Sequence, residues 1–129
     1  MQIKFVSVMV NDQETALRFY TEILGFEKMA DLPIGPNRWL TVTSPDGMAG
    51  VELVLEPMAF PPAQVFQRAL FEAGIPAMAL ISRDIQADYA RLSGLGVIFR
   101  GAPQSFGPIS SAVFEDTCGN LVNLVQPAG

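Results

Sequence analysis

The sequence predicts an α+β fold in which one strand–helix–strand unit occurs twice. A strand pattern near the N-terminus is followed at once by a helical pattern, and the same succession returns in the second half of the chain. Its landmarks recur at a matched interval: Asp12 and Asp84, each just after a predicted strand, lie 72 residues apart. Leu24 and Leu95, each followed by a glycine, lie 71 apart. A matched period indicates an internal repeat, and two unrelated strand–helix units are the alternative.

The first unit opens with the strand "KFVSVMV", whose alternation places Val6, Val8 and Val10 on one face and Phe5, Ser7 and Met9 on the other. Asn11 is the predicted cap of the following helix, with Glu14 completing a capping box and Gly25 ending the helix. Further strands are predicted near "RWLTVTSP" and "GVELVLEP". The proline and glycine of "DLPIGP" predict a loop.

The second unit repeats this order. "PAMALIS" predicts a strand, "RDIQADYARLSGLG" a helix and "VIFRG" a short strand. "SAVFEDTCGNLVNLVQ" predicts a hairpin that turns at residues 117–120, and "GAPQSFGPIS" predicts a loop. Between the two units, "PPAQVFQRALFEAG" predicts a helix with proline in its first turn and Gly74 at its end.

The composition of the chain limits the classes of function that it can have. Half of the residues are apolar and 16% are charged, which is typical of a folded domain. No apolar run approaches a membrane span of about 20 residues, and the first residues lack a signal-peptide pattern. The net charge of −5, with 8 scattered basic residues, disfavours nucleic acid. A single cysteine, Cys118, excludes an internal disulfide. We therefore expect a cytoplasmic domain with neither membrane nor nucleic acid as a partner.

"VMVNDQETALRFYTEILGFE", "VELVLEP" and "FEDTCGNLVNLVQ" together resemble the vicinal oxygen chelate superfamily, and the resemblance covers nearly the whole chain. That superfamily includes glyoxalase I, fosfomycin and bleomycin resistance proteins, and extradiol dioxygenases. The resemblance implies one domain, residues 1–129, with two βαβββ modules that form a cupped, partly open mixed sheet around a ligand. Module one would span about 2–57, the connecting helix about 61–74 and module two about 75–127. It also implies a homodimer.

In metal-dependent members, each module supplies ligands from its first and last strands. The resemblance places these positions at Phe5, Glu52, Ala77 and Asn123. Phenylalanine and alanine donate nothing to a metal, and the asparagine oxygen is a weak neutral donor. We therefore expect no metal and no cofactor. Classical glyoxalase I and extradiol dioxygenase chemistry, which depends on histidine ligands, is disfavoured in a chain without histidine.

Several residues are candidates for contacting a ligand. Phe5 is either core packing or an apolar wall of the site, and Ala77 leaves vacant space for a ligand. Trp39 either offers a flat surface for stacking or caps the first module. Phe106 either closes over the ligand or anchors its loop. Glu52 is either a semi-buried carboxylate with a raised pKa or a cationic ligand partner, or a strand residue that is solvated or paired with a nearby arginine. Asn123 hydrogen-bonds either a ligand or the backbone.

The leading hypothesis is a metal-independent small-molecule-binding protein of the bleomycin-resistance type, holding an apolar, aromatic or cationic ligand. The second is an enzyme, a lyase, isomerase or dioxygenase-related protein, whose candidate catalytic residue is Glu52 acting as a base or whose metal binds through rearranged carboxylates. A third is an interaction or regulatory subunit that uses no pocket.

Overall fold

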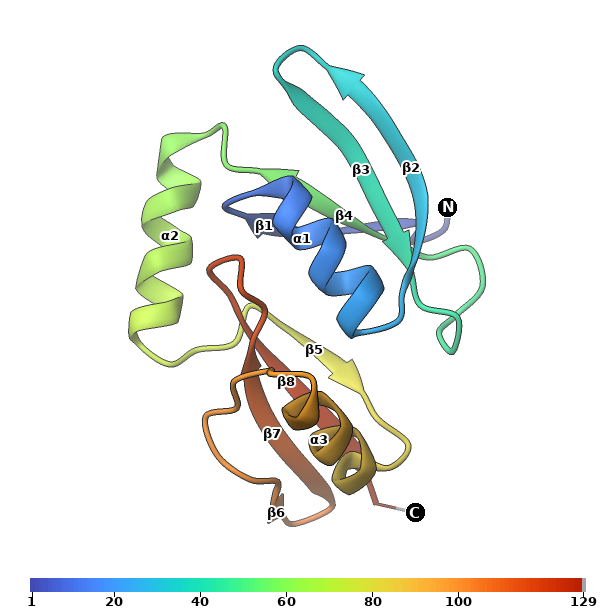
Figure 1. Ribbon diagram of the computed structural model, residues 1–129, viewed down its shortest axis with the longest axis vertical. Helices are drawn as coiled ribbons and strands as arrows, with labels where there is room; N and C mark the ends of the chain where they lie inside the picture. The colour runs from blue at the N-terminus through green and yellow to red at the C-terminus, as the bar shows by residue number, and fades with distance from the viewer. Residues whose placement is uncertain (129) are drawn as a thin grey trace. The chain divides into compact units, whose positions relative to one another are not determined.

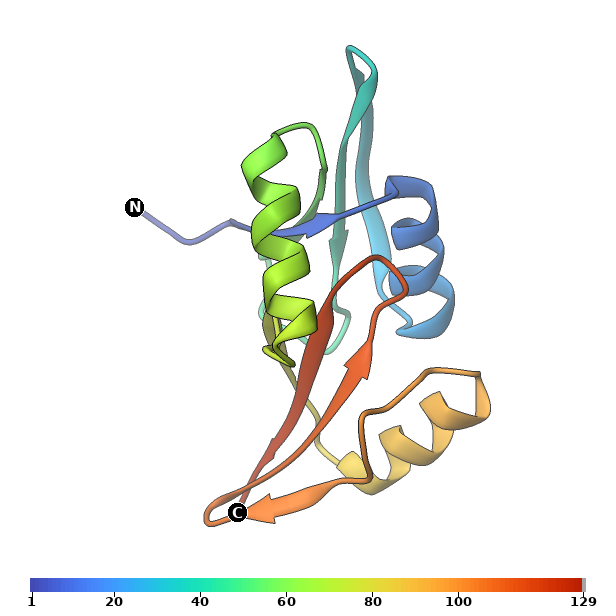
Figure 2. The same ribbon diagram turned by 90° about the vertical axis from the view of Figure 1, so that its left-hand side faces the viewer.

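The computed structural model describes residues 1–128, and the chain divides into two compact units, residues 1–66 and residues 67–129. Each unit contains a four-stranded mixed sheet whose first and last strands are parallel neighbours (Figures 1 and 2). The predicted α+β class and the two βαβββ modules are confirmed. Among residues 1–128, no helix has the length and apolar character needed to cross a membrane.

The first unit has the sheet order β1-β4-β3-β2. β1 runs parallel to β4, and the remaining neighbours are antiparallel. The elements are β1 (Phe5–Val10), α1 (Gln13–Arg18), a π-helical turn η1 (Phe19–Ile23), β2 (Glu27–Ile34), β3 (Asn37–Thr43) and β4 (Glu52–Pro57).

The second sheet has the equivalent order β5-β8-β7-β6, with β5 parallel to β8. A helix, α2 (Pro61–Glu72), is present where the sequence predicts a connecting helix. The second module follows it and contains β5 (Met78–Ile81), α3 (Ile85–Gly94), β6 (Gln104–Phe106), β7 (Ile109–Glu115) and β8 (Leu121–Pro127). β7 and β8 form the predicted hairpin around residues 117–120.

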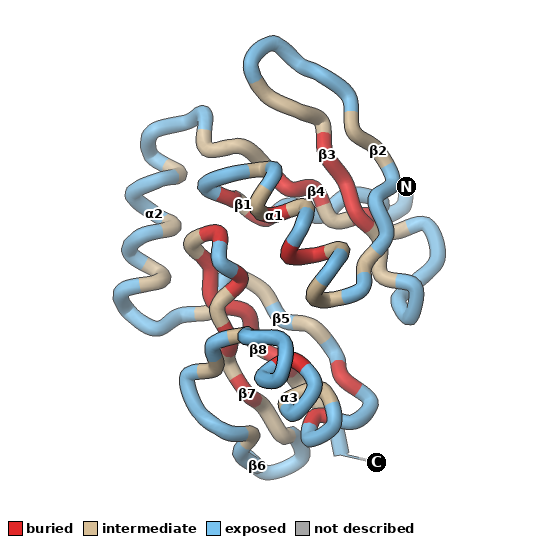
Figure 3. Tube along the Cα trace, viewed as in Figure 1, coloured by how far each residue is buried: buried red, intermediate tan, exposed pale blue. Residues whose placement is uncertain are grey.

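In each unit, one face of the sheet is covered by the helix that follows its first strand. Figure 3 shows the buried residues of the first unit gathered on β3, β4, the end of β1 and the inner side of α1 and η1. Apolar side chains from both layers form this core: Val8, Val10, Ala16, Phe19, Tyr20, Leu40, Val42 and Leu55. In the second unit, Ile85 and Leu92 of α3 are buried with the alternate residues Ala112, Phe114, Val122 and Leu124 of β7 and β8. Alternation along the strands thus decides which side chains remain for the other face.

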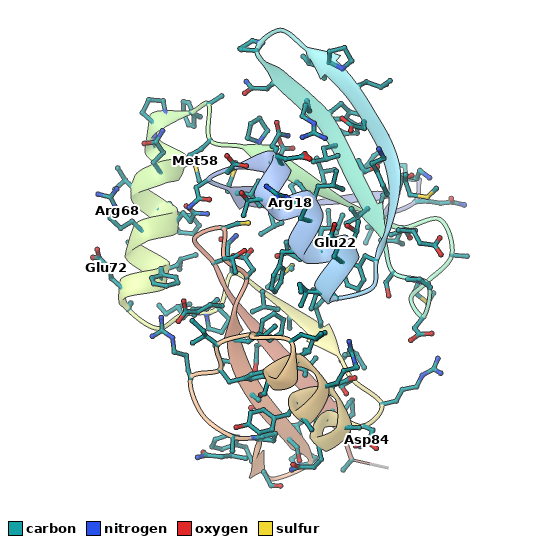
Figure 4. The ribbon with its side chains drawn as sticks, viewed as in Figure 1. Arg18, Glu22, Met58, Arg68, Glu72 and Asp84 are labelled. Atoms are coloured by element: carbon teal, nitrogen blue, oxygen red, sulfur yellow. The ribbon has the colours of Figure 1, made fainter. Side chains whose placement is uncertain are left out.

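The first helix starts one residue later than the sequence predicts. Asp12, not Asn11, is the N-cap, because its extended backbone lets the carboxylate accept a hydrogen bond of 2.8 Å from the Thr15 N–H. Glu14 forms no capping box and instead receives a hydrogen bond of 3.0 Å from Arg38. Asp84 caps α3 through the Ala87 N–H, so both aspartates of the predicted repeat play the same role (Asp84 is labelled in Figure 4).

The prediction that "DLPIGP" forms a loop is wrong, because its first residues form the end of β2. Asp31 receives two hydrogen bonds, of 2.9 and 2.7 Å, from the Arg38 guanidinium across the hairpin. Pro33 is tolerated because β2 is an edge strand, where a missing N–H breaks no ladder. Only the short turn at Gly35, with φ of +55°, departs from the strands.

Two further predictions for the second module are corrected. "VIFRG" contributes only an isolated bridge between Phe99 and Phe114, not a strand of its own. "GAPQSFGPIS" is not an extended loop, because it holds β6 and the start of β7 around a turn at Gly107. Polar and glycine-rich edge hairpins have the same composition as loops, which is why pattern alone misassigned both hairpins.

Gln13 joins α1 to the sheet where β3 and β4 separate. Their paired residues are Thr41 with Val54 and Val42 with Leu53. Beyond them, the Gln13 amide fills the space between the two backbones. Its Nε2 donates to the carbonyls of Arg38 and Leu55, each at 2.8 Å, and its Oε1 accepts from the Arg38 N–H at 3.1 Å. One side chain therefore replaces the missing rungs of the ladder.

We predict that Gln13→Leu lowers the free energy of unfolding by about 1–3 kcal/mol, the cost of leaving part-buried backbone groups without partners. Gln64→Leu is the matched control, because Gln64 is exposed and donates one bond, of 3.2 Å, to the Met58 carbonyl. Chemical denaturation measures both variants. Equal stability losses in the two would contradict the role assigned to Gln13.

Candidate functional site

The candidate site lies on the far face of the first sheet, meaning the face turned away from α1. Charged side chains of the helix layer, such as Arg18 and Glu22, are exposed and separate from it (Figure 4). Strand registers define the far face. Phe5 pairs with Glu52, Ser7 with Val54, Met9 with Glu56, and Val54 also with Thr41. Ser7, Val54 and Thr41 therefore form a central row across three strands.

Two aromatic rings meet over this row. Phe5 precedes Ser7 and Trp39 precedes Thr41 on strands of opposite direction, so they approach the row from opposite ends. Their ring centroids lie 5.3 Å apart with planes at 76°, an edge-to-face contact. Val54, in the middle, is only 2% exposed, whereas Phe5 remains 48% exposed. The far face therefore presents an accessible aromatic surface supported by buried residues.

Glu52 is held beside this surface by two partners. Its Oε1 accepts a hydrogen bond of 2.6 Å from the Thr41 hydroxyl, and its Oε2 lies 2.9 Å from the Lys4 Nζ. The residue is 9% exposed, so its charge needs both partners. Of the expected alternatives, pairing within the protein is the one observed, although the cation is Lys4 and not an arginine. Lys4 also lies 5.6 Å from the centre of the Phe5 ring.

These contacts set the acidity of Glu52. The hydrogen bond from Thr41, and then that from Lys4, hold the pKa of the Glu52 carboxyl below its ordinary value of 4.5. A general base acting near neutral pH needs the opposite shift. The site thus offers Glu52 as a fixed anion and disfavours it as a proton acceptor.

Glu56 shares the far face with Glu52 but has a different environment. Its Oε1 accepts a hydrogen bond of 3.2 Å from the Ser7 hydroxyl. Within residues 1–128, it forms no ion pair with a lysine or arginine. Glu56 is therefore an oriented carboxylate whose charge is not neutralised by a neighbour.

The other candidates belong to the second unit. Ala77 lies just before β5 and is exposed, while its N–H donates to the Leu121 carbonyl at 2.8 Å. Asn123 on β8 pairs with Ala79 and Val113, so its neighbour on β5 is Ala79 and not Ala77. The Asn123 Oδ1 atom is buried and has no hydrogen-bond partner within residues 1–128. Phe106 is exposed on β6, away from this register.

A divalent metal does not fit the residues at the positions implied by the family resemblance. Phe5 and Ala77 have no donor atom, and Glu52 is already engaged by Thr41 and Lys4. Asn123 offers one neutral oxygen. Across residues 1–128, no three histidine, cysteine, aspartate or glutamate side chains are grouped closely enough to hold a metal ion. No chemical step through a metal can be assigned to these residues.

The structure brings together Phe5, Trp39 and Glu52, and adds residues that the sequence did not single out. Lys4 and Thr41 were missed because only the strand pairing reveals them as partners of Glu52. Ser7 and Glu56 could have been found, since alternation alone places both on the same faces as Phe5 and Glu52.

The chain is thus an α+β protein of two βαβββ modules, and the positions that the resemblance implies for metal ligands hold few donor atoms. Residues 2–124 match the model of the Glyoxalase/Bleomycin resistance protein/Dioxygenase superfamily, and the chain belongs to this family. It is also similar to the uncharacterised protein YurT of Bacillus subtilis (strain 168). The two are 48% identical over 126 residues, covering 98% of this chain and 99% of YurT.

Solved structures show the same similarity. UcmS2 superposes with a TM-score of 0.83 at 35% identity, covering 97% of both chains. TnmS3, an antibiotic binding protein from Streptomyces sp. CB03234, gives a TM-score of 0.78 at 34% identity. That comparison covers 99% of this chain and 97% of TnmS3.

We predict that Glu52 stabilises the fold in a pH-dependent way. Because its pKa is lowered on folding, its contribution is present above the ordinary value of 4.5 and is lost as the pH falls through the folded value. Glu52→Gln should therefore be less stable than the unsubstituted protein at pH 7, and this difference should shrink towards pH 3. Urea denaturation at both pH values measures it. A stability difference that is the same at the two pH values would contradict this account.

Proposed function

We propose that the protein is a metal-independent small-molecule-binding protein whose far face holds an apolar, aromatic or cationic ligand. The observation that carries the proposal is the edge-to-face pair of Phe5, which is exposed, and Trp39, which is partly exposed. Phe5 stands at a position where the family resemblance implies a metal ligand, so an aromatic surface replaces a coordinating group. The antibiotic-binding activity of TnmS3, a similar protein, supports the proposal.

The chemistry of the far face favours a planar ligand. Aromatic rings interact best with flat, polarisable molecules and with cations. Leu32, opposite Trp39 on β2, extends the apolar surface and is exposed. Glu52 and Glu56 border it with carboxylate oxygens. Ala77, Phe106 and Asn123 are proposed separately, as ligand-contacting residues of the second unit. Phe5 and Trp39 would supply most of the contact area, and the polar groups would select among ligands.

We predict that a planar ligand quenches or shifts the fluorescence of Trp39 saturably. The fluorescence signal has a single origin, because Trp39 is the only tryptophan in the sequence. Phe5→Leu keeps an apolar side chain and removes the ring, so it should weaken binding by about 0.5–1.5 kcal/mol. Val6→Ala is the matched control, because Val6 is similarly exposed, at 46%, but alternates to the opposite face.

The titration is performed with a screen of planar aromatic compounds, antibiotics among them, with and without the chelator EDTA. Binding should be the same under both conditions. Loss of binding in EDTA, or one tightly held transition metal per chain by elemental analysis, would contradict the metal-independent function. If Phe5→Leu and Val6→Ala weaken ligand binding equally, the aromatic pair does not contact the ligand.

We also propose a homodimer. β2 is an edge strand, and it carries three exposed apolar side chains, Met29, Leu32 and Ile34. Such an edge favours association with another chain. Sedimentation should show a dimer at micromolar concentration, and a monomer that persists at high micromolar concentration would overturn this part of the proposal.

A further inference from the structure

We propose that Glu56, oriented by Ser7, is the group on the far face that selects a ligand carrying a positive charge, and that the ligand is a planar aromatic molecule with an ammonium group on a short arm. This inference rests on the proposed function and specifies its ligand. It follows from the different partners of Glu52 and Glu56, the two carboxylates that β4 places on the far face.

Glu52 is poorly placed to receive a cation. Its two oxygens are engaged by Thr41 and Lys4, at 2.6 and 2.9 Å. A ligand ammonium approaching Glu52 would also meet the positive charge of Lys4, whose Nζ lies 2.9 Å from the Glu52 Oε2. The two like charges would repel each other. The Lys4 Nζ also lies 5.6 Å from the centre of the Phe5 ring. The Phe5 end of the far face therefore disfavours a second cation.

Glu56 has the opposite properties. It is partly exposed, its Oε1 accepts only the neutral Ser7 hydroxyl, and no ion pair to it is formed within residues 1–128. The hydrogen bond restricts the carboxylate, while the second oxygen remains available to a ligand. An ammonium group would gain a charge-assisted hydrogen bond here without displacing a cation of the protein.

The registers give the length of the arm. Glu56 lies two residues along β4 from Val54, which belongs to the central row beneath the aromatic rings. Two strand residues span roughly 7 Å. A ligand whose ring system contacts Phe5 and Trp39 would therefore reach Glu56 with an ammonium group on an arm of several atoms.

Dansylcadaverine is a suitable probe, because it joins a naphthalene ring to a primary ammonium through a pentyl arm. N-acetyl dansylcadaverine is its neutral counterpart with the same ring and arm. Energy transfer from Trp39 to the dansyl group measures both affinities at pH 7. The unsubstituted protein should bind the amine more tightly than the acetamide. Glu56→Gln should weaken the amine by roughly fivefold to tenfold and leave the acetamide unchanged.

Two further variants test whether the effect is specific to Glu56. Glu22→Gln is the charge-matched control, because Glu22 is exposed on η1 in the helix layer and its loss should change neither affinity. Ser7→Ala removes the hydrogen bond that orients Glu56 and should weaken the amine by a smaller factor than Glu56→Gln does.

The outcomes separate this inference from the proposed function. Equal binding of the amine and the acetamide, or an amine affinity that Glu56→Gln leaves intact, would overturn the role of Glu56 while the aromatic site stands. Loss of amine binding in Glu52→Gln but not in Glu56→Gln would show that the ammonium group binds Glu52, and would overturn the role of Glu56. If neither probe binds the unsubstituted protein, the aromatic site itself fails, and this inference fails with it.

Discussion

The carboxylate of Glu52 occupies a largely buried position on the far face of a sheet that is otherwise held together by apolar packing, and its charge can remain there only with partners. Thr41 and Lys4 provide them, from a neighbouring strand and from the residue preceding β1. These contacts connect three segments of the first unit and neutralise its buried charge. With Glu52 satisfied, Phe5 and Trp39 can meet over the central row. Glu56, the other β4 carboxylate on this face, forms no ion pair within residues 1–128.

This arrangement explains how a protein of this family can lack the usual metal donors. The position that the resemblance assigns to a histidine carries Phe5. Glu52, whose carboxylate could serve as a metal ligand at one of the four positions, is engaged within the protein. An aromatic surface and a metal site make different demands, since the first needs accessible apolar area and the second needs converging donor atoms. The residues of the far face meet the first demand. The buried Asn123 Oδ1 shows that a polar group also persists on the second sheet without a partner within residues 1–128.

Much of the fold could be predicted from the sequence because the signals were local. Alternation in "KFVSVMV" assigned the two faces of β1, and the matched aspartates indicated the internal repeat, although Asn11 and not Asp12 was the predicted helix cap. β2 was missed because Pro33 and Gly35 resemble a loop, whereas the bond between Arg38 and Asp31 that supports the hairpin is visible only after pairing. Likewise, the sequence identified Glu52 as informative but not its pairing with Lys4 and Thr41, since those contacts depend on strand register. Local patterns therefore predicted the elements, and long-range pairing determined the chemistry of the site.

If the far face of the first unit receives the ligand, as we propose, the amides of that face should respond to it. Amide chemical shifts followed by NMR during a titration with dansylcadaverine measure this response. We expect saturable shifts concentrated at Phe5, Ser7, Trp39 and Glu56, with little change at Asp12 and Gln13 on the helix side. Saturable shifts centred on α1 and η1, with the far-face amides unchanged, would contradict the proposal.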